Sequence, residues 1–163
     1  MRTTHWRRRN RGGRRAYPGP PDSAPVSDVP SAAHRAVLAD ALRLVREQAA
    51  RLDRDPTAAP LAEVAAEPFG LGYLFGAVDA LCQGHGAPFD GMALAVYALA
   101  LDAALGREAP DVRDRALDLH ELEDPTFKRG RRWGGNEATG WKLGRHTPEG
   151  LLHLARGDGD RMR

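Results

Sequence analysis

The stretch LGYLFGAVDALCQG, residues 71–84, indicates the fold class of this protein. Its large apolar side chains recur at spacings of three and four residues, which is the period of an α-helix. They form one predicted helix face that consists of Leu71, Leu74, Phe75, Val78 and Cys82. The stretch is therefore predicted to be a helix that packs this face into a core.

A second face of the same predicted helix has almost no side chains, because Gly72, Gly76, Ala80 and Gly84 lie four residues apart. Glycine inside a helix costs about 0.5 to 1 kcal/mol relative to alanine, so such a row indicates that another backbone packs closely against it. That backbone belongs either to the same chain or to a second subunit. In the second case the chain forms a homo-oligomer through Gly72, Gly76 and Ala80.

Composition extends the helical prediction to the rest of the chain. Isoleucine is absent and valine occurs 8 times, against 19 leucines and 27 alanines. Leucine and alanine favour helices, whereas β-branched residues favour strands. No window approaches the ~18 consecutive apolar residues of a membrane span. The sequence therefore predicts a soluble, all-α domain.

Helix-terminal signals and apolar spacing locate the other helices. Ser31 can cap the first, and Pro60 and Pro68 mark the start and an interruption of the second. Two more cover residues 92–105 and 111–123, and a short one follows near the C-terminus. The helix over 92–105 is apolar on nearly all sides, so we expect it at the centre of a compact bundle of four or five main helices.

Charge divides the chain into regions. Residues 1–15 carry seven arginines and no acid, residues 31–127 carry eight basic and sixteen acidic side chains, and residues 128–146 carry six basic and one acidic. The 22 arginines also fit a GC-rich coding sequence, so only the placement of charge is informative. The predicted organisation is a disordered Arg/Gly/Pro-rich tail (1–30), a helical domain (31–156) and a frayed C-terminus (157–163).

The tail is a candidate for nucleic-acid binding through Arg7, Arg8 and Arg9, because arginine neutralises phosphates and stacks on bases together with aromatic rings such as Trp6. Three alternatives compete with this interpretation. In the first, the tail is simply solvated. In the second, it folds back on the acidic body of its own chain. In the third, it is an upstream extension from a wrongly assigned start codon.

The second basic segment, TFKRGRRWGG at residues 126–135, alternates cations, aromatic rings and glycines. It is predicted to be a loop followed by a short helix from Asn136, with backbone N–H groups free to approach an anion. Alternatively, the two tryptophans are buried and the arginines neutralise the acidic helix over 111–123. The predicted binding residues are Lys128, Arg129, Arg131, Arg132, Trp133, Trp141 and Lys142, together with Arg7, Arg8 and Arg9 of the tail.

Catalytic and metal signatures are weak. The single cysteine, Cys82, excludes a disulfide scaffold and falls on an apolar helix face, where a thiol is a poor nucleophile. Asp79 lies at the border of the glycine row, as an acid–base group or as the structural partner of an arginine. Asp102, His85 and His120 support acid–base or metal chemistry only if folding brings them together. No cofactor is predicted.

These observations predict a non-catalytic, cytoplasmic interaction module with no membrane partner. It would bind an acidic protein or another anionic partner through the basic-aromatic segment. The alternative is a nucleic-acid-binding protein that uses the arginine tail, and a third hypothesis is a metal- or carboxylate-dependent hydrolase.

Overall fold

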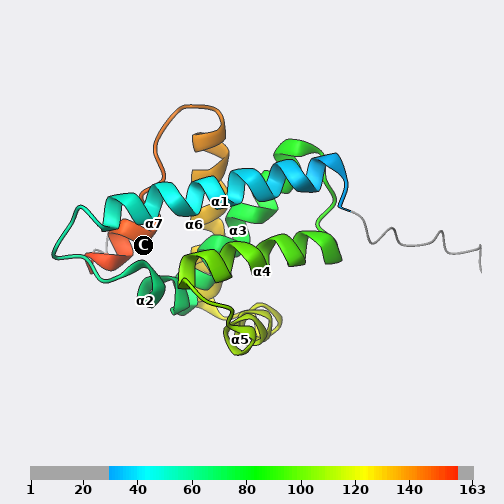
Figure 1. Ribbon diagram of the computed structural model, residues 1–163. Helices are drawn as coiled ribbons and strands as arrows, with labels where there is room; N and C mark the ends of the chain where they lie inside the picture. The colour runs from blue at the N-terminus through cyan, green and yellow to red at the C-terminus, as the bar shows by residue number, and fades with distance from the viewer. Residues whose placement is uncertain (1–29, 158–163) are drawn as a thin grey trace, which may run out of the picture.

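The protein is represented by a computed structural model that describes residues 30–157. These residues form seven α-helices and no strand (Figure 1), which confirms the all-α prediction. Predictions for the tail, for Arg7, Arg8 and Arg9 and for the extreme C-terminus lie outside the described residues. The helices are α1 (Ala32–Leu52), α2 (Leu61–Ala66), α3 (Pro68–His85), α4 (Gly91–Leu105), α5 (Pro110–Glu121), α6 (Pro125–Lys142) and α7 (Gly150–Ala155).

The helix at the centre is α3, which contacts each of the other six helices. Twelve of its eighteen residues are buried, on both the apolar face and the glycine face. The prediction that the helix over 92–105 is central was wrong. That helix, α4, lies beside α1 (Figure 1) and leaves Leu94 36% and Leu99 49% exposed. Its outer side includes Ala95 and Ala103, whose small side chains add little apolar area to the surface.

The helix start predicted at Ser31 agrees with the structure. The Ser31 hydroxyl accepts from the His34 backbone N–H, and the Asp90 carboxylate accepts from two backbone N–H groups at the start of α4. The helix is interrupted between Ala66 and Pro68 as predicted, and Pro68 occupies the first turn of α3. His34, in the first turn of α1, is 5% exposed. Local capping chemistry thus determines where these helices begin.

The backbone that packs against the glycine face of α3 is α6 of the same chain. A methyl group at Gly72 would overlap the Phe127 carbonyl, and one at Gly76 would overlap the Arg131 carbonyl. The contact is reciprocal, because Gly130 and Gly134 of α6 face the backbone of α3 in the same way. The face through Gly72 and Gly76 is therefore occupied by α6 of the same chain, and the structure does not support the predicted homo-oligomer contact there.

The segment 126–135 is not a loop but the first half of α6, and Asn136 lies inside this helix rather than at its cap. Asp124 caps α6 by accepting from the backbone N–H groups of Thr126 and Phe127. The glycines that argued for a loop are the residues that allow close packing on α3, and this packing outweighs their low helix propensity. Leu122, two residues before this cap, is 78% exposed.

A buried polar network attaches the short helix α7 to the core. The Tyr73 hydroxyl donates to the Glu137 carboxylate at 2.5 Å and accepts from the Gln48 amide at 3.0 Å. Glu137 also accepts from the backbone N–H groups of Glu149 and Gly150, and Gln48 accepts from that of Leu151. The N–H groups at the start of α7 are therefore satisfied by side chains of α1 and α6. Burial, reinforced by the Glu137 charge, raises the pKa of Tyr73 well above its ordinary value.

Between residues 30 and 157 no helix combines the length and the apolar character that crossing a membrane requires.

Candidate functional site

A groove runs along the junction of α3 and α6, on the side that the predicted basic residues face. It has a volume of about 510 Å³. Small residues, among them Gly76, Ala80 and Gly135, form part of its lining, because the two helices are packed too closely there for larger side chains. The remaining lining residues are polar or charged and comprise Asp79, Gln83, Lys128, Arg131, Arg132, Asn136 and Thr139.

The basic residues of the groove form a stripe along α6. Arg131 and Arg132 follow Lys128 by three and four residues, and Lys142 follows Thr139 by three, spacings that keep each group near one side of the helix. Phe127, Gly130, Gly134 and Ala138 form the buried side of the same helix. Regular helix geometry therefore gathers cations that a loop would have scattered.

Part of this positive charge is neutralised by the chain itself. Arg131 forms an ion pair with Asp79 of α3 at 2.9 Å, and Gln83 donates to the same carboxylate at 3.1 Å. Lys128 pairs with Glu123 at 3.0 Å, but both side chains are more than half exposed. Such an exposed pair contributes only about 0 to 1 kcal/mol, so Lys128 remains accessible to a partner.

Arg132 is the cation of the groove that the structure leaves free. It is exposed and forms no hydrogen bond or ion pair with any of residues 30–157. Arg129, also exposed, has no such partner in this range either, but it does not line the groove. The alternative prediction that Arg131 and Arg132 neutralise the acidic helix over 111–123 was wrong. Arg131 pairs with Asp79 of α3, and Arg132 forms no ion pair with that acidic helix.

Trp141 belongs to the scaffold rather than to the groove. Its indole N–H donates to Glu47 at 2.9 Å, and the Arg43 guanidinium lies 4.4 Å from the ring centroid. Trp133 is likewise partly buried against the core, and its ring lies where a side chain at Gly150 would stand. The two aromatic residues of the predicted binding set thus pack against the core of the protein.

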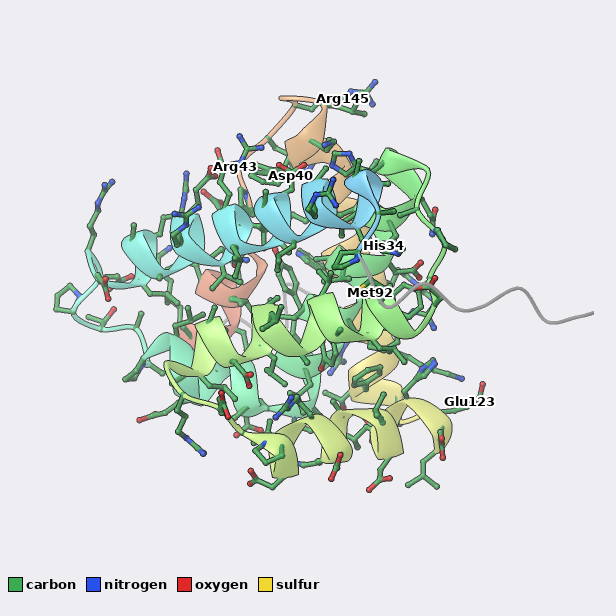
Figure 2. All side chains as sticks on the ribbon, turned by 45° about the vertical axis from the view of Figure 1, so that its right-hand side comes forward. His34, Asp40, Arg43, Met92, Glu123 and Arg145 are labelled. Atoms are coloured by element: carbon green, nitrogen blue, oxygen red, sulfur yellow. The ribbon has the colours of Figure 1, made fainter. Side chains whose placement is uncertain are left out.

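Lys142 lies at the end of the stripe, in a cluster that joins three helices. Its ammonium contacts Asp40 at 2.5 Å and the His85 Nε2 at 2.6 Å, and that same nitrogen lies 2.8 Å from Asp40. Figure 2 shows Asp40 on α1, near Arg43. Burial alone would raise the pKa of Asp40, but hydrogen bonds from Lys142 and His85 outweigh it and keep this pKa below its ordinary value.

A second hollow of about 470 Å³ continues the groove toward this cluster. The two share Ala80, Gln83 and Thr139. The second hollow is more apolar and includes Leu81 and Leu143. Together they give the α3/α6 junction a polar, basic end near Lys128 and an apolar end near Leu143.

The side chains considered for acid–base chemistry are not brought together. Asp79 pairs with Arg131, and His120 lies 4.8 Å from the Phe75 ring and 5.9 Å from the Phe127 ring, centroid to centroid. Asp102 accepts from the Ala109 backbone N–H at 3.2 Å. Over residues 30–157 no group of three or more His, Cys, Asp or Glu side chains has an arrangement that could hold a metal ion. Burial, with the Asp79 charge, raises the pKa of the Cys82 thiol to about 11.

Sequence reasoning missed Asp40, Glu47 and Gln48. Only Gln48 left a signal, because it falls on the apolar stripe of α1 between Val45 and Leu52 and is fully buried. A polar side chain at such a position needs a buried partner, which here is Tyr73.

Comparison with protein-family models, with curated proteins and with solved structures finds no match to this chain.

Proposed function

We propose that the α3/α6 groove binds an acidic segment of a partner protein, and that the protein acts as an interaction module. The observation that carries this proposal is Arg132, an exposed cation beside a groove and without an ion-pair partner among the described residues. Lys128 adds a second charge at little cost, since its pair with Glu123 is exposed.

The shape of the groove favours an extended chain over a compact anion. Small residues in its lining allow a backbone to approach closely, and Gln83, Asn136 and Thr139 offer amide and hydroxyl groups for hydrogen bonds to that backbone. The apolar continuation past Leu81 and Leu143 suits an apolar side chain that follows the acidic ones. The proposed ligand is therefore an acidic peptide with an apolar residue at one end.

The proposal is tested by titrating the full chain into a fluorescein-labelled peptide rich in glutamate, with one terminal leucine. Arg132→Glu should weaken binding at least tenfold, because it replaces an attraction by a repulsion of about 1 kcal/mol or more. Arg107→Glu is the matched control, since Arg107 is an exposed arginine in the connection between α4 and α5. Equal binding by both variants would contradict the proposal.

Nucleic-acid binding through the tail stays a prediction, since Arg7, Arg8 and Arg9 lie outside the described residues. Single-stranded RNA of similar length serves as the competing probe in the same titration. Tighter binding of the RNA, with a steep dependence on salt, would favour this alternative. The hydrolase hypothesis is the weaker one, because Asp79, Asp102, His85 and His120 each contact a different partner and not one another.

A further inference from the structure

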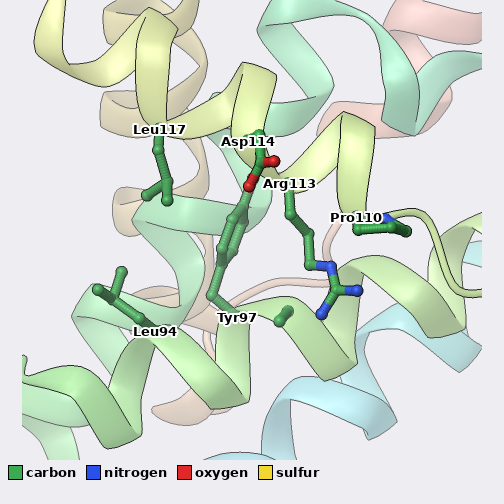
Figure 3. A pocket seen from close by; sticks show the side chains of 7 residues that line it. Leu94, Tyr97, Pro110, Arg113, Asp114 and Leu117 are labelled. Atoms are coloured by element: carbon green, nitrogen blue, oxygen red, sulfur yellow. The ribbon is translucent and has the colours of Figure 1, made fainter.

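A second, separate groove lies between α4 and α5, and Figure 3 shows it from close by. It has a volume of about 320 Å³ and a largely apolar lining. Leu94 of α4 and Leu117 of α5 are 36% and 37% exposed, so the groove presents large apolar side chains to its surroundings. Its other lining residues are Tyr97, Ala98, Pro110, Arg113 and Asp114.

An acidic stripe borders this groove. Asp111, Asp114, Asp118 and Glu121 recur at spacings of three and four along the exposed side of α5. None of the four forms an ion pair with a residue between 30 and 157. The arginines of α5 do not pair with this stripe: Arg113, which lines the groove, lies 4.0 Å from Asp102 of α4, and Arg115 donates to the Ala66 carbonyl. Unneutralised negative charge thus lies beside an apolar groove.

The described chain begins at Pro30, and the helix that follows it contacts the start of α4, one of the two helices of this groove. His34, in the first turn of α1, lies 3.3 Å from both the Pro88 carbonyl and the Asp90 carboxylate that caps α4. Figure 2 shows His34 beside Met92. Leu94 follows Met92 in the first turns of α4. The 29 residues that precede Pro30, at up to ~3.3 Å each, reach farther than the ~22 Å length of α4.

The segment 1–29 has the complementary chemistry. Its first 15 residues carry seven arginines and no acid, with Trp6 directly before Arg7, Arg8 and Arg9. An indole is large enough to cover Leu94 and Leu117, and arginines pair with carboxylates in bidentate geometry. Covalent attachment raises the effective concentration of the segment at the groove to about the millimolar range. The α3/α6 groove, being basic, repels the same segment.

We propose that residues 1–29 bind in cis to the α4/α5 groove, with Trp6 over Leu94 and Leu117 and the following arginines along the acidic stripe of α5. The segment is then held against its own domain, and an anionic competitor such as a nucleic acid must displace it. This inference is independent of the α3/α6 groove, since it uses a different surface of opposite charge.

The test attaches a nitroxide spin label to Thr4→Cys in the full chain and records amide NMR signals. Cys82 is fully buried and stays unlabelled in the folded protein. The amide signals of Leu94, Asp114 and Leu117 should fall at least twofold, while those of Arg132 and Thr139 stay unchanged. About 1 M NaCl should restore them, because the screening length then falls to about 3 Å. Broadening that is uniform, or centred on α6, would overturn the proposal.

Two variants of the spin-labelled chain sharpen the result. Asp114→Asn with Asp118→Asn should abolish the broadening, whereas Asp53→Asn with Glu63→Gln, which changes exposed acids outside α5, should leave it. Trp6→Ala should restore the Leu94 and Leu117 signals. If these signals stay as weak as in the spin-labelled chain with Trp6, then Trp6 does not bind in the groove. A mixture of isotope-labelled and spin-labelled copies should show no broadening, because broadening there means a second copy rather than binding in cis.

Discussion

Gly76 of α3 lies so close to the Arg131 carbonyl of α6 that a single methyl group at residue 76 would overlap this oxygen. Gly72, Gly130 and Gly134 show the same close approach, so small residues line the α3/α6 contact on both helices. The same close approach places Asp79 within 2.9 Å of Arg131 and leaves a groove above the junction. Glycine packing thus determines both the core and the candidate site.

The first prediction concerns this contact. Gly76→Ala should destabilise the protein by about 1 to 3 kcal/mol, because rigid backbone cannot move away from the added methyl group. Gly84→Ala is the matched control in the same helix, where nothing lies within 4 Å of the added carbon. That change should stabilise the protein by about 0.5 to 1 kcal/mol. Urea denaturation measures both, and a stable Gly76→Ala variant would contradict the packing described above.

A second prediction concerns the half-buried Glu137 carboxylate, which holds α7. Glu137→Ala leaves the Tyr73 hydroxyl and the N–H groups of Glu149 and Gly150 without their acceptor. The expected loss is about 1 to 3 kcal/mol, with faster amide hydrogen exchange in α7. Glu108→Ala, at an exposed position between α4 and α5, should change stability by less than about 0.5 kcal/mol. Unchanged exchange in α7 would mean that Glu137 does not hold it.

The third prediction is a pH dependence. Hydrogen bonds from Thr57 and Arg156 lower the pKa of Asp55 from 3.8 to about 2. Because the folded-state pKa is the lower one, this contribution to stability is present above pH 3.8 and is lost as the pH falls toward 2.

Asp55→Asn should therefore have a lower Tm than the native protein near neutral pH, and the difference should shrink as the pH falls to about 2. Asp53→Asn, two residues earlier at the end of α1, serves as the control and should keep the native profile. Circular dichroism melts at several pH values measure these differences. A Tm difference that persists at the acid end would show that the ionised carboxylate is not the cause.

A fourth prediction concerns the single thiol. Burial, with the Asp79 charge, raises the pKa of Cys82 to about 11, and the side chain has no exposed surface. A thiol-reactive dye should therefore label the folded protein at least tenfold more slowly than the protein in denaturant. Comparable rates would mean that α3 opens readily, contrary to its place at the centre of the fold.

The sequence predicted α3 well because two independent patterns coincide on it, an apolar stripe and a glycine row. The prediction for α6 was wrong, because the glycines of residues 126–135 indicated a loop where the structure has a helix. Gly130 and Gly134 are compatible with a helix only because Gly72 and Gly76 face them. That match between segments some sixty residues apart is a tertiary effect, and local propensity carries no trace of it.

The candidate site was predictable in part. The cations of residues 128–142 were identified from charge placement, and their order along a helix followed once α6 was known to be continuous. Pairing was not predictable, because Asp40 and Asp79, which neutralise Lys142 and Arg131, come from α1 and α3. Hence only Arg132 of the groove cations kept the free charge that the sequence suggested for all of them.

The proposal of an anion-binding groove is tested most directly by mapping where an acidic peptide binds. Amide NMR spectra of the full chain, recorded during titration with the glutamate-rich peptide, should show shifts at Arg132, Asn136 and Thr139. Signals of α2, which contributes no residue to the groove, should stay in place. Shifts confined to other surfaces, or none at low salt, would contradict the proposed function.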